Sequence, residues 1–163
     1  MVRDWSFLVV DDGARQHRGN EGYDDEPNRH YSWDSTVPNR DGPDAGDLCL
    51  VRDSRGALGV SQIDEVDRTE GVKLRLRCPE CTSTALKART KVRPTYRCSD
   101  CEAVFDAPDE RAIEVTKYRA DYGRSWLPID GAVTASELEA SCYLSHANNM
   151  RSVGSNRTPC GSW

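Results

Sequence analysis

Four of the seven cysteines form two C-x2-C pairs, a pattern that binds metal in many proteins. Cys78 pairs with Cys81 and Cys98 with Cys101, and 16 residues separate the two pairs. Four thiolates complete the tetrahedral shell of a zinc ribbon and leave no coordination position for an activated water. The spacing therefore predicts one structural Zn2+. A redox role for either pair is the weaker alternative.

The other three cysteines lie apart from this pattern. Cys49 and Cys142 are expected in the core as small apolar residues, and Cys160 carries no assignment. The odd cysteine count and the lack of an export signal favour metal in a reducing compartment over a disulfide framework. No apolar run approaches the length of about 20 residues that a membrane span needs, so no membrane partner is expected.

A second group of polar and aromatic side chains lies in the segment Tyr31 to Asn39. An indole is followed by a carboxylate, two hydroxyls and an amide (Trp33, Asp34, Ser35, Thr36 and Asn39). Such groups can stack on a nucleic-acid base and read its edge. A buried tryptophan beside a helix cap at Asp34 or Ser35 would give the same pattern.

Charge is distributed unevenly along the chain. The formal net charge is −5, yet residues 68–98 contain nine Lys and Arg against two Glu. Alternation with Ala88, Thr90 and Val92 predicts a strand with one basic face that could contact phosphates, formed by Lys87, Arg89, Lys91 and Arg93. A solvated hairpin without a partner is the alternative.

Around these groups the chain reads as strands joined by polar loops. We expect one helix that starts at the capping box of Thr134 and Glu137 and runs to about residue 145. Residues 11–30 predict a long loop. The turn Asp53 to Gly56 predicts a hairpin between two of the strands, which are expected at 5–10, 31–33, 48–52, 57–63, 72–77 and 112–118.

Three stretches resemble the PUA-like superfamily, in particular its EVE and YTH members. They are Trp33-x-x-Thr36-x-x-Asn39, then Gly46-Asp47, then Leu58-Gly59-Val60. The resemblance implies an α+β fold, with a small β-barrel flanked by helices and the four-cysteine zinc ribbon as an insert. It implies a PUA-like domain at 1–77 and 102–151, the ribbon at 78–101 and a tail or linker at 152–163.

A longer series of motifs resembles the N-terminal modules of HNH-type, modification-dependent (type IV) restriction endonucleases. It starts at His17-Arg18-Gly19-Asn20, continues through residues 31–39 and the ribbon, and ends at Val115-Thr116-x-Tyr118-Arg119-Ala120-x-Tyr122. The three histidines do not have the HNH spacing, so the resemblance implies a reader without the nuclease. It implies a non-enzymatic module for duplex DNA in the bacterial cytoplasm, associated with the nucleoid and with an HNH nuclease domain or subunit.

The resemblance also implies roles for single residues. Trp33 would be one wall of a cage around a flipped base, with 5-substituted cytosine favoured and N6-methyladenine second. Asp34 would accept a hydrogen bond from an exocyclic amine, and Ser35, Thr36 and Asn39 would form the rim. The second wall would be Trp126 or Tyr23, with Tyr118 and Tyr122 as further candidates.

Backbone contacts are expected from the four ribbon cations and from a polar loop that contains Arg15, His17, Arg18 and Asn20. The alternative for the loop is an ordered surface segment tied to Asp24 and Asp25.

Two other functions compete with the DNA reader. The first is an RNA-binding PUA-like module that acts on tRNA or rRNA. The second is an enzyme, for which the chain has no nucleophile elbow, no phosphate loop and no His-carboxylate metal cluster. The acidic pairs at 11–12 and 24–25 could hold a divalent ion, but such pairs in loops are usually solvated.

Overall fold

The computed structural model describes residues 2–9, 24–89, 91–141 and 150–152. This part of the chain is mostly β and divides into two compact units. The first unit contains the described residues up to 69 and from 116 onward, and the second contains residues 70–115. The second unit thus includes parts of two long strands besides the segment 78–101 that the sequence predicts as the insert. None of the described helices has the length and apolar character needed to cross a membrane.

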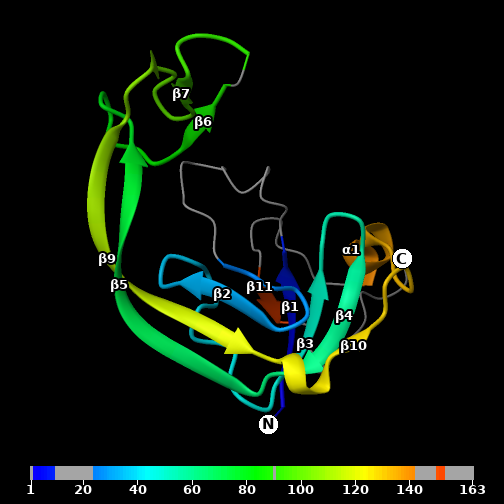
Figure 1. Ribbon diagram of the computed structural model, residues 1–163. Helices are drawn as coiled ribbons and strands as arrows, with labels where there is room; N and C mark the ends of the chain where they lie inside the picture. The colour runs from blue at the N-terminus through cyan, green and yellow to red at the C-terminus, as the bar shows by residue number, and fades with distance from the viewer. Residues whose placement is uncertain (1, 10–23, 90, 142–149, 153–163) are drawn as a thin grey trace, which may run out of the picture. The chain divides into compact units, whose positions relative to one another are not determined.

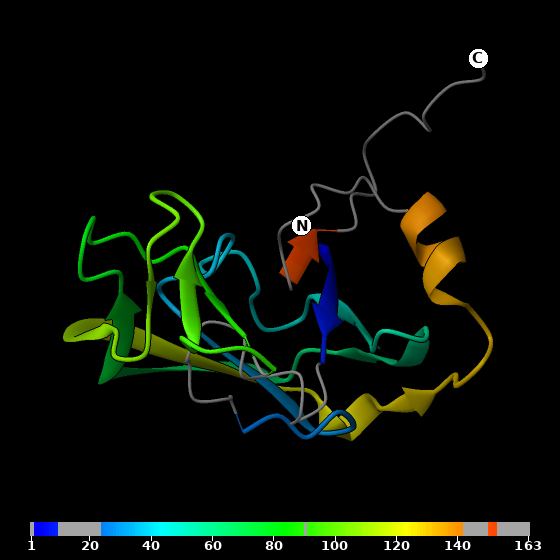
Figure 2. The same ribbon diagram turned by 90° about the horizontal axis from the view of Figure 1, so that it is seen from above.

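The larger sheet of the first unit has the strand order β10-β4-β3-β1-β11. β1 is parallel to β3, β3 is antiparallel to β4, and Figures 1 and 2 show β11 beside β1. The strands are β1 (Asp4–Leu8), β3 (Leu48–Arg52), β4 (Ala57–Gln62), β10 (Leu127–Pro128) and β11 (Met150–Ser152).

The hairpin between β3 and β4 confirms the prediction from its turn sequence. The Asp53 carboxylate accepts hydrogen bonds from the backbone N–H of Arg55 at 2.7 Å and of Gly56 at 3.0 Å. These bonds satisfy the donors of the tight turn. A Cβ atom at position 56 would lie 2.4 Å from the backbone oxygen of Val133, so the close approach of this segment requires glycine.

The second sheet of three strands has the order β2-β9-β5. Its strands are β2 (His30–Asp34), β9 (Asp109–Asp121) and β5 (Glu65–Arg77). β2 pairs antiparallel with β9, which places Trp33 directly opposite Tyr118. β5 and β9 are longer than the strands predicted at 72–77 and 112–118, and each runs through both units.

Aromatic side chains form most of the core of the first unit. Phe7 of β1 stacks on Tyr31 of β2 with ring centroids 4.7 Å apart. Trp5 shares its side of β1, and Val9, just after the strand, belongs to the same core. Cys49 lies in this core as predicted, and burial raises the pKa of its thiol to about 12. Cys142 and Cys160 lie outside the described residues.

The expected closed barrel is not found in the described part of the chain, where the larger sheet ends at β10 and β11 and the second sheet at β2 and β5. Besides the strands, the described residues form a 3-10 turn at Gly123–Ser125 and the helix α1 (Ala135–Ser141). The predicted capping box is confirmed, because Thr134 N–H donates to Glu137 Oε2 at 2.8 Å and Glu137 N–H donates to Thr134 Oγ1 at 3.3 Å. The predicted continuation of the helix beyond residue 141 lies outside the described residues.

The second unit contains a small antiparallel sheet with the order β6-β7-β8. Its strands are β6 (Leu86–Ala88), β7 (Tyr96–Cys98) and β8 (Val104–Phe105). Leu86 and the sulfur-bearing Cys78 and Cys98 are buried, with Tyr96 and Phe105 packed against them. This core is small for a unit of its size, so a bound metal would contribute much of its stability.

Candidate metal centre and nucleic-acid interface

The two cysteine pairs form tight turns of similar geometry. Cys78 N–H donates to the Ser83 backbone oxygen at 2.8 Å, and Cys98 N–H donates to the Ala103 backbone oxygen at 2.9 Å. The residue after each pair has a left-handed backbone, with φ of 60° at Thr82 and 63° at Glu102. This conformation turns the chain back, so that both sulfurs of a pair point to the same side.

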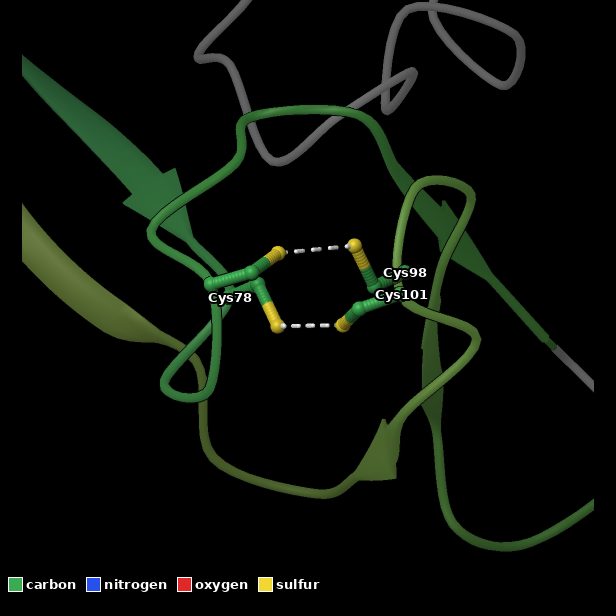
Figure 3. Close-up of side chains that lie close together, drawn as sticks. Cys78, Cys98 and Cys101 are labelled. Carbon is green, nitrogen blue, oxygen red and sulfur yellow. Dashed lines mark hydrogen bonds between the residues drawn. The ribbon is translucent and has the colours of Figure 1, made fainter.

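The four sulfurs surround a common centre between the two turns. All four lie within 4.8 Å of one another, and Figure 3 shows the sulfurs of Cys78, Cys98 and Cys101 directed toward a common centre. Cys78 and Cys101 have their sulfurs 3.6 Å apart, as do Cys81 and Cys98. A tetrahedral ion with metal–sulfur bonds of about 2.3 Å would separate its sulfurs by about 3.8 Å. The cluster therefore has the size that binds a metal ion.

Backbone N–H groups favour the thiolate form of one of these ligands. Asp100 N–H donates to Cys98 Sγ at 3.4 Å. Hydrogen bonds from the backbone of Cys101 and of Asp100 lower the pKa of the Cys98 thiol to about 7. Because the thiolate is the form that coordinates metal, these hydrogen bonds favour the coordinating form of Cys98.

The predicted basic face is only partly present. β6 ends at Ala88, so Lys91 and Arg93 do not continue the strand that carries Lys87, and their placement on its face is wrong. Arg93 precedes Pro94, which has no N–H to extend strand pairing, and its guanidinium pairs with Asp106 at 3.1 Å. Arg89 donates to the Pro94 backbone oxygen.

The sequence interpretation missed one cation of the basic face, Arg97. Lys87 of β6 stands directly opposite Arg97 of β7, and both are exposed. Residues opposite each other in a strand pair share a face, so the two positive charges lie side by side on the ribbon. Arg97 also pairs with Glu102 at 2.8 Å. Alternation within Tyr96-Arg97-Cys98, with Cys98 turned inward to the sulfur cluster, could have revealed Arg97.

Trp33, the expected wall of a base pocket, is enclosed in the core. Its side chain is 1% exposed and contacts the rings of Phe7, Tyr31 and Tyr118. The indole Nε1–H donates to the Arg40 backbone oxygen at 2.9 Å. In this arrangement the indole has no face open to a flipped base. Its surroundings match the alternative prediction, a buried tryptophan.

The polar residues after Trp33 build a turn. Asp34 is 2% exposed, and its Oδ1 accepts hydrogen bonds from Thr36 N–H at 2.8 Å and Thr36 Oγ1 at 2.5 Å. Ser35 pairs with Thr116 of β9 through its backbone N–H at 2.8 Å and its hydroxyl at 3.2 Å. Asn39 is exposed with φ of 64°. Asp34 thus closes a turn at the end of β2 and does not cap a helix, which was the alternative to base recognition.

Trp126, one of the two favoured second walls, has no ring contact with Trp33 in the described part of the chain. Trp126 stacks on Tyr122 and covers Gly59, where an added Cβ would lie 2.2 Å from the indole. Trp33 and Trp126 therefore have different ring partners. Several predicted contacts lie outside the described residues, namely Tyr23, Arg15, His17, Arg18 and Asn20.

Tyr118 combines an aromatic contact in the core with two charged neighbours. One face of its ring stacks on Trp33, with centroids 5.4 Å apart and planes 4° apart. The guanidinium of Arg68 lies over the ring at 5.9 Å from its centroid. The hydroxyl donates to Asp41 Oδ1 at 2.7 Å, and this bond raises the pKa of Tyr118 above its usual range.

Comparison of the chain with protein-family models, with curated proteins and with solved structures gives no match.

Proposed function

We propose that this chain is a binding module that recognises a modified base in duplex DNA by base flipping. The favoured target is 5-substituted cytosine, with N6-methyladenine as the second candidate. In this proposal the chain has a PUA-like fold and directs a restriction endonuclease, and an HNH nuclease domain or subunit makes the cut. The resemblance of the sequence to PUA-like domains supports the recognition of a modified base. The exposed cations of the ribbon support the contact with DNA.

The observation that carries the DNA-binding proposal is the cation pair of Lys87 and Arg97. Like charges placed directly opposite each other in a strand pair destabilise the sheet. Glu102 offsets part of this repulsion at Arg97, and a phosphate group near both side chains would offset it at Lys87 as well and gain charge-assisted hydrogen bonds. A duplex offers phosphates at regular spacing, and such contacts position a protein on DNA without reading its sequence.

In the same proposal the metal in the ribbon is Zn2+ with a structural role. Zinc favours tetrahedral coordination by thiolates, and Cys78, Cys81, Cys98 and Cys101 supply four of them. The ion would hold the turns on which β6 and β7 depend. It would thereby fix the position of Lys87 relative to Arg97.

A binding titration tests the function. The chain is titrated with duplexes of one sequence that carry a single 5-methylcytosine, 5-hydroxymethylcytosine, N6-methyladenine or no modification, and with an RNA hairpin of matched length. We expect binding to every duplex to weaken with salt and one modified duplex to bind more tightly than the unmodified one. Equal affinity for all four duplexes would refute the reader function, and preference for the hairpin would favour the RNA-binding alternative.

A further inference from the structure

Three side chains form a stacked row across neighbouring strands of the first unit. Trp33 lies on β2, Tyr118 on β9 and Arg68 on β5, and these strands are adjacent in the order β2-β9-β5. Trp33 is in the core, whereas Arg68 is exposed. Tyr118 is therefore the last ring of the core, and a flexible cation covers its outer face.

Arg68 is held at this place by little else. Within the described residues its guanidinium has no hydrogen bond or ion pair, and its contact is with the ring of Tyr118. By contrast, Arg119 of β9 is fixed by Asp121 at 3.0 Å. The cover over Tyr118 can thus move without breaking another interaction.

A carboxylate stands beside the same ring. Asp41 binds the Tyr118 hydroxyl through Oδ1, while its Oδ2 lies 3.3 Å from Arg40 Nε. The Asp41 side chain is 66% exposed, unlike that of Asp34, which is buried. A carboxylate has room for about four hydrogen bonds, so Asp41 can still accept one from an exocyclic amine such as cytosine N4.

We propose that the flipped base stacks on the outer face of Tyr118, between this ring and the guanidinium of Arg68. Trp33 supports the ring from behind, and Asp41 reads the amine at the edge of the base. This inference rests on the proposed base-reading function and places its pocket at residues that the sequence interpretation did not favour.

The distances and strengths of the contacts agree with this insertion. A base between two planes separates them by about twice the 3.4 Å stacking rise of DNA, roughly 7 Å. The Arg68 guanidinium, now 5.9 Å from the ring centroid, would move outward by about 1 Å. An exposed cation over a ring contributes about two- to fivefold to an equilibrium constant, whereas a stacked base contributes about 5- to 150-fold. The base therefore displaces the cation from the ring.

Substitution of Tyr118 gives the first test. Tyr118→Leu removes the ring but keeps apolar volume, and Tyr118→Phe is the matched control that keeps the ring. We expect Tyr118→Leu to lose about 5- to 150-fold in affinity for the preferred modified duplex, with little change for the unmodified duplex. Tyr118→Phe should retain most of the preference. A folded Tyr118→Leu protein, judged by its thermal melt, that discriminates as well as the wild type would overturn the inference.

A crosslinking experiment covers the case in which Tyr118→Leu fails to fold. The wild-type chain is irradiated with a duplex that carries one 5-iodocytosine, and the crosslinked residue is identified by mass spectrometry. We expect the crosslink at Tyr118 or Arg68. If the wild type discriminates between duplexes but crosslinks at a residue outside this row, the pocket lies elsewhere. If the wild type shows no discrimination, the proposed function fails instead.

Discussion

Trp33 and Tyr118 stand directly opposite each other on β2 and β9, and their rings are stacked with planes only 4° apart. Trp33 is 1% exposed and Tyr118 is 6% exposed. The pair therefore joins the two strands by an aromatic contact of the kind that stabilises sheets. Trp33 is packed inside the core, whereas Tyr118 lies slightly nearer the surface.

Replacement of Trp33 should destabilise the first unit. We expect Trp33→Ala to lower the free energy of unfolding by about 3–5 kcal/mol, since it removes a large side chain from a packed core. Trp33→Phe should cost less, because a ring remains against Tyr118. Urea denaturation of the three proteins measures the effect. An alanine variant as stable as the wild type would contradict the burial of Trp33.

Metal removal should unfold the ribbon. We expect one metal ion per chain, and a strong chelator should abolish the dispersed NMR signals of residues 78–105 because their apolar core is small. Cys81→Ser should lower the metal content, while Cys49→Ala, which changes a buried thiol outside the cluster, should keep it at one ion. Elemental analysis checks both variants. A wild-type content well below one ion would refute the site.

Thr82 offers a way to strengthen the ribbon. Its φ of 60° is unfavourable for a β-branched residue, and a left-handed residue costs about 1–2 kcal/mol unless it is glycine. We expect Thr82→Gly to stabilise the metal-loaded ribbon by about 1 kcal/mol, after the added freedom of the unfolded chain is counted. Thr84→Gly, at a residue without positive φ, should destabilise it. Thermal denaturation of the metal-loaded proteins distinguishes these outcomes.

The cation pair should determine the salt dependence of DNA binding. Neutralising Lys87 and Arg97 together, as Lys87→Gln and Arg97→Gln, should weaken binding to all duplexes alike and reduce the salt slope by up to about 0.9 per lost phosphate contact. Arg93→Gln is the control, because Arg93 is a ribbon cation that lies outside the strand pair of β6 and β7. Affinities measured over a range of salt concentrations give the slopes. Equal slopes for the double variant and the wild type would exclude this surface as the phosphate contact.

The capping box should make α1 sensitive to acid. The hydrogen bond from Thr134 N–H lowers the pKa of the Glu137 carboxyl. Its stabilising effect is therefore complete above the pKa of an unfolded glutamate, about 4.3, and is lost as the pH falls through the lower pKa of the folded chain. An NMR titration of the Glu137 carboxyl should show the lowered pKa. Thr134→Ala keeps the backbone N–H but removes the hydroxyl bond to Glu137 Oε2, so it should move this pKa part of the way back up. A Glu137 pKa at the unfolded value would argue against the box.

Local chemistry accounts for what the sequence by itself determined. The spacing of Cys78 and Cys81 brings their sulfurs together because the intervening turn is only a few residues long. The hydrogen bonds of Asp53 and Thr134 act within three residues, so the hairpin turn and the helix start were predictable from composition and order.

Only the tertiary structure decided which side chains remain accessible. Residues 31–34 give the same pattern whether or not other side chains cover their strand. Phe7 of β1 and Tyr118 of β9, both distant in sequence, pack against Trp33. The partner of Lys87 depended equally on where β6 ends and on its register with β7, which places Arg97 opposite it. Burial and register arise from contacts between distant segments, and neither alternation nor residue type within one segment specifies them.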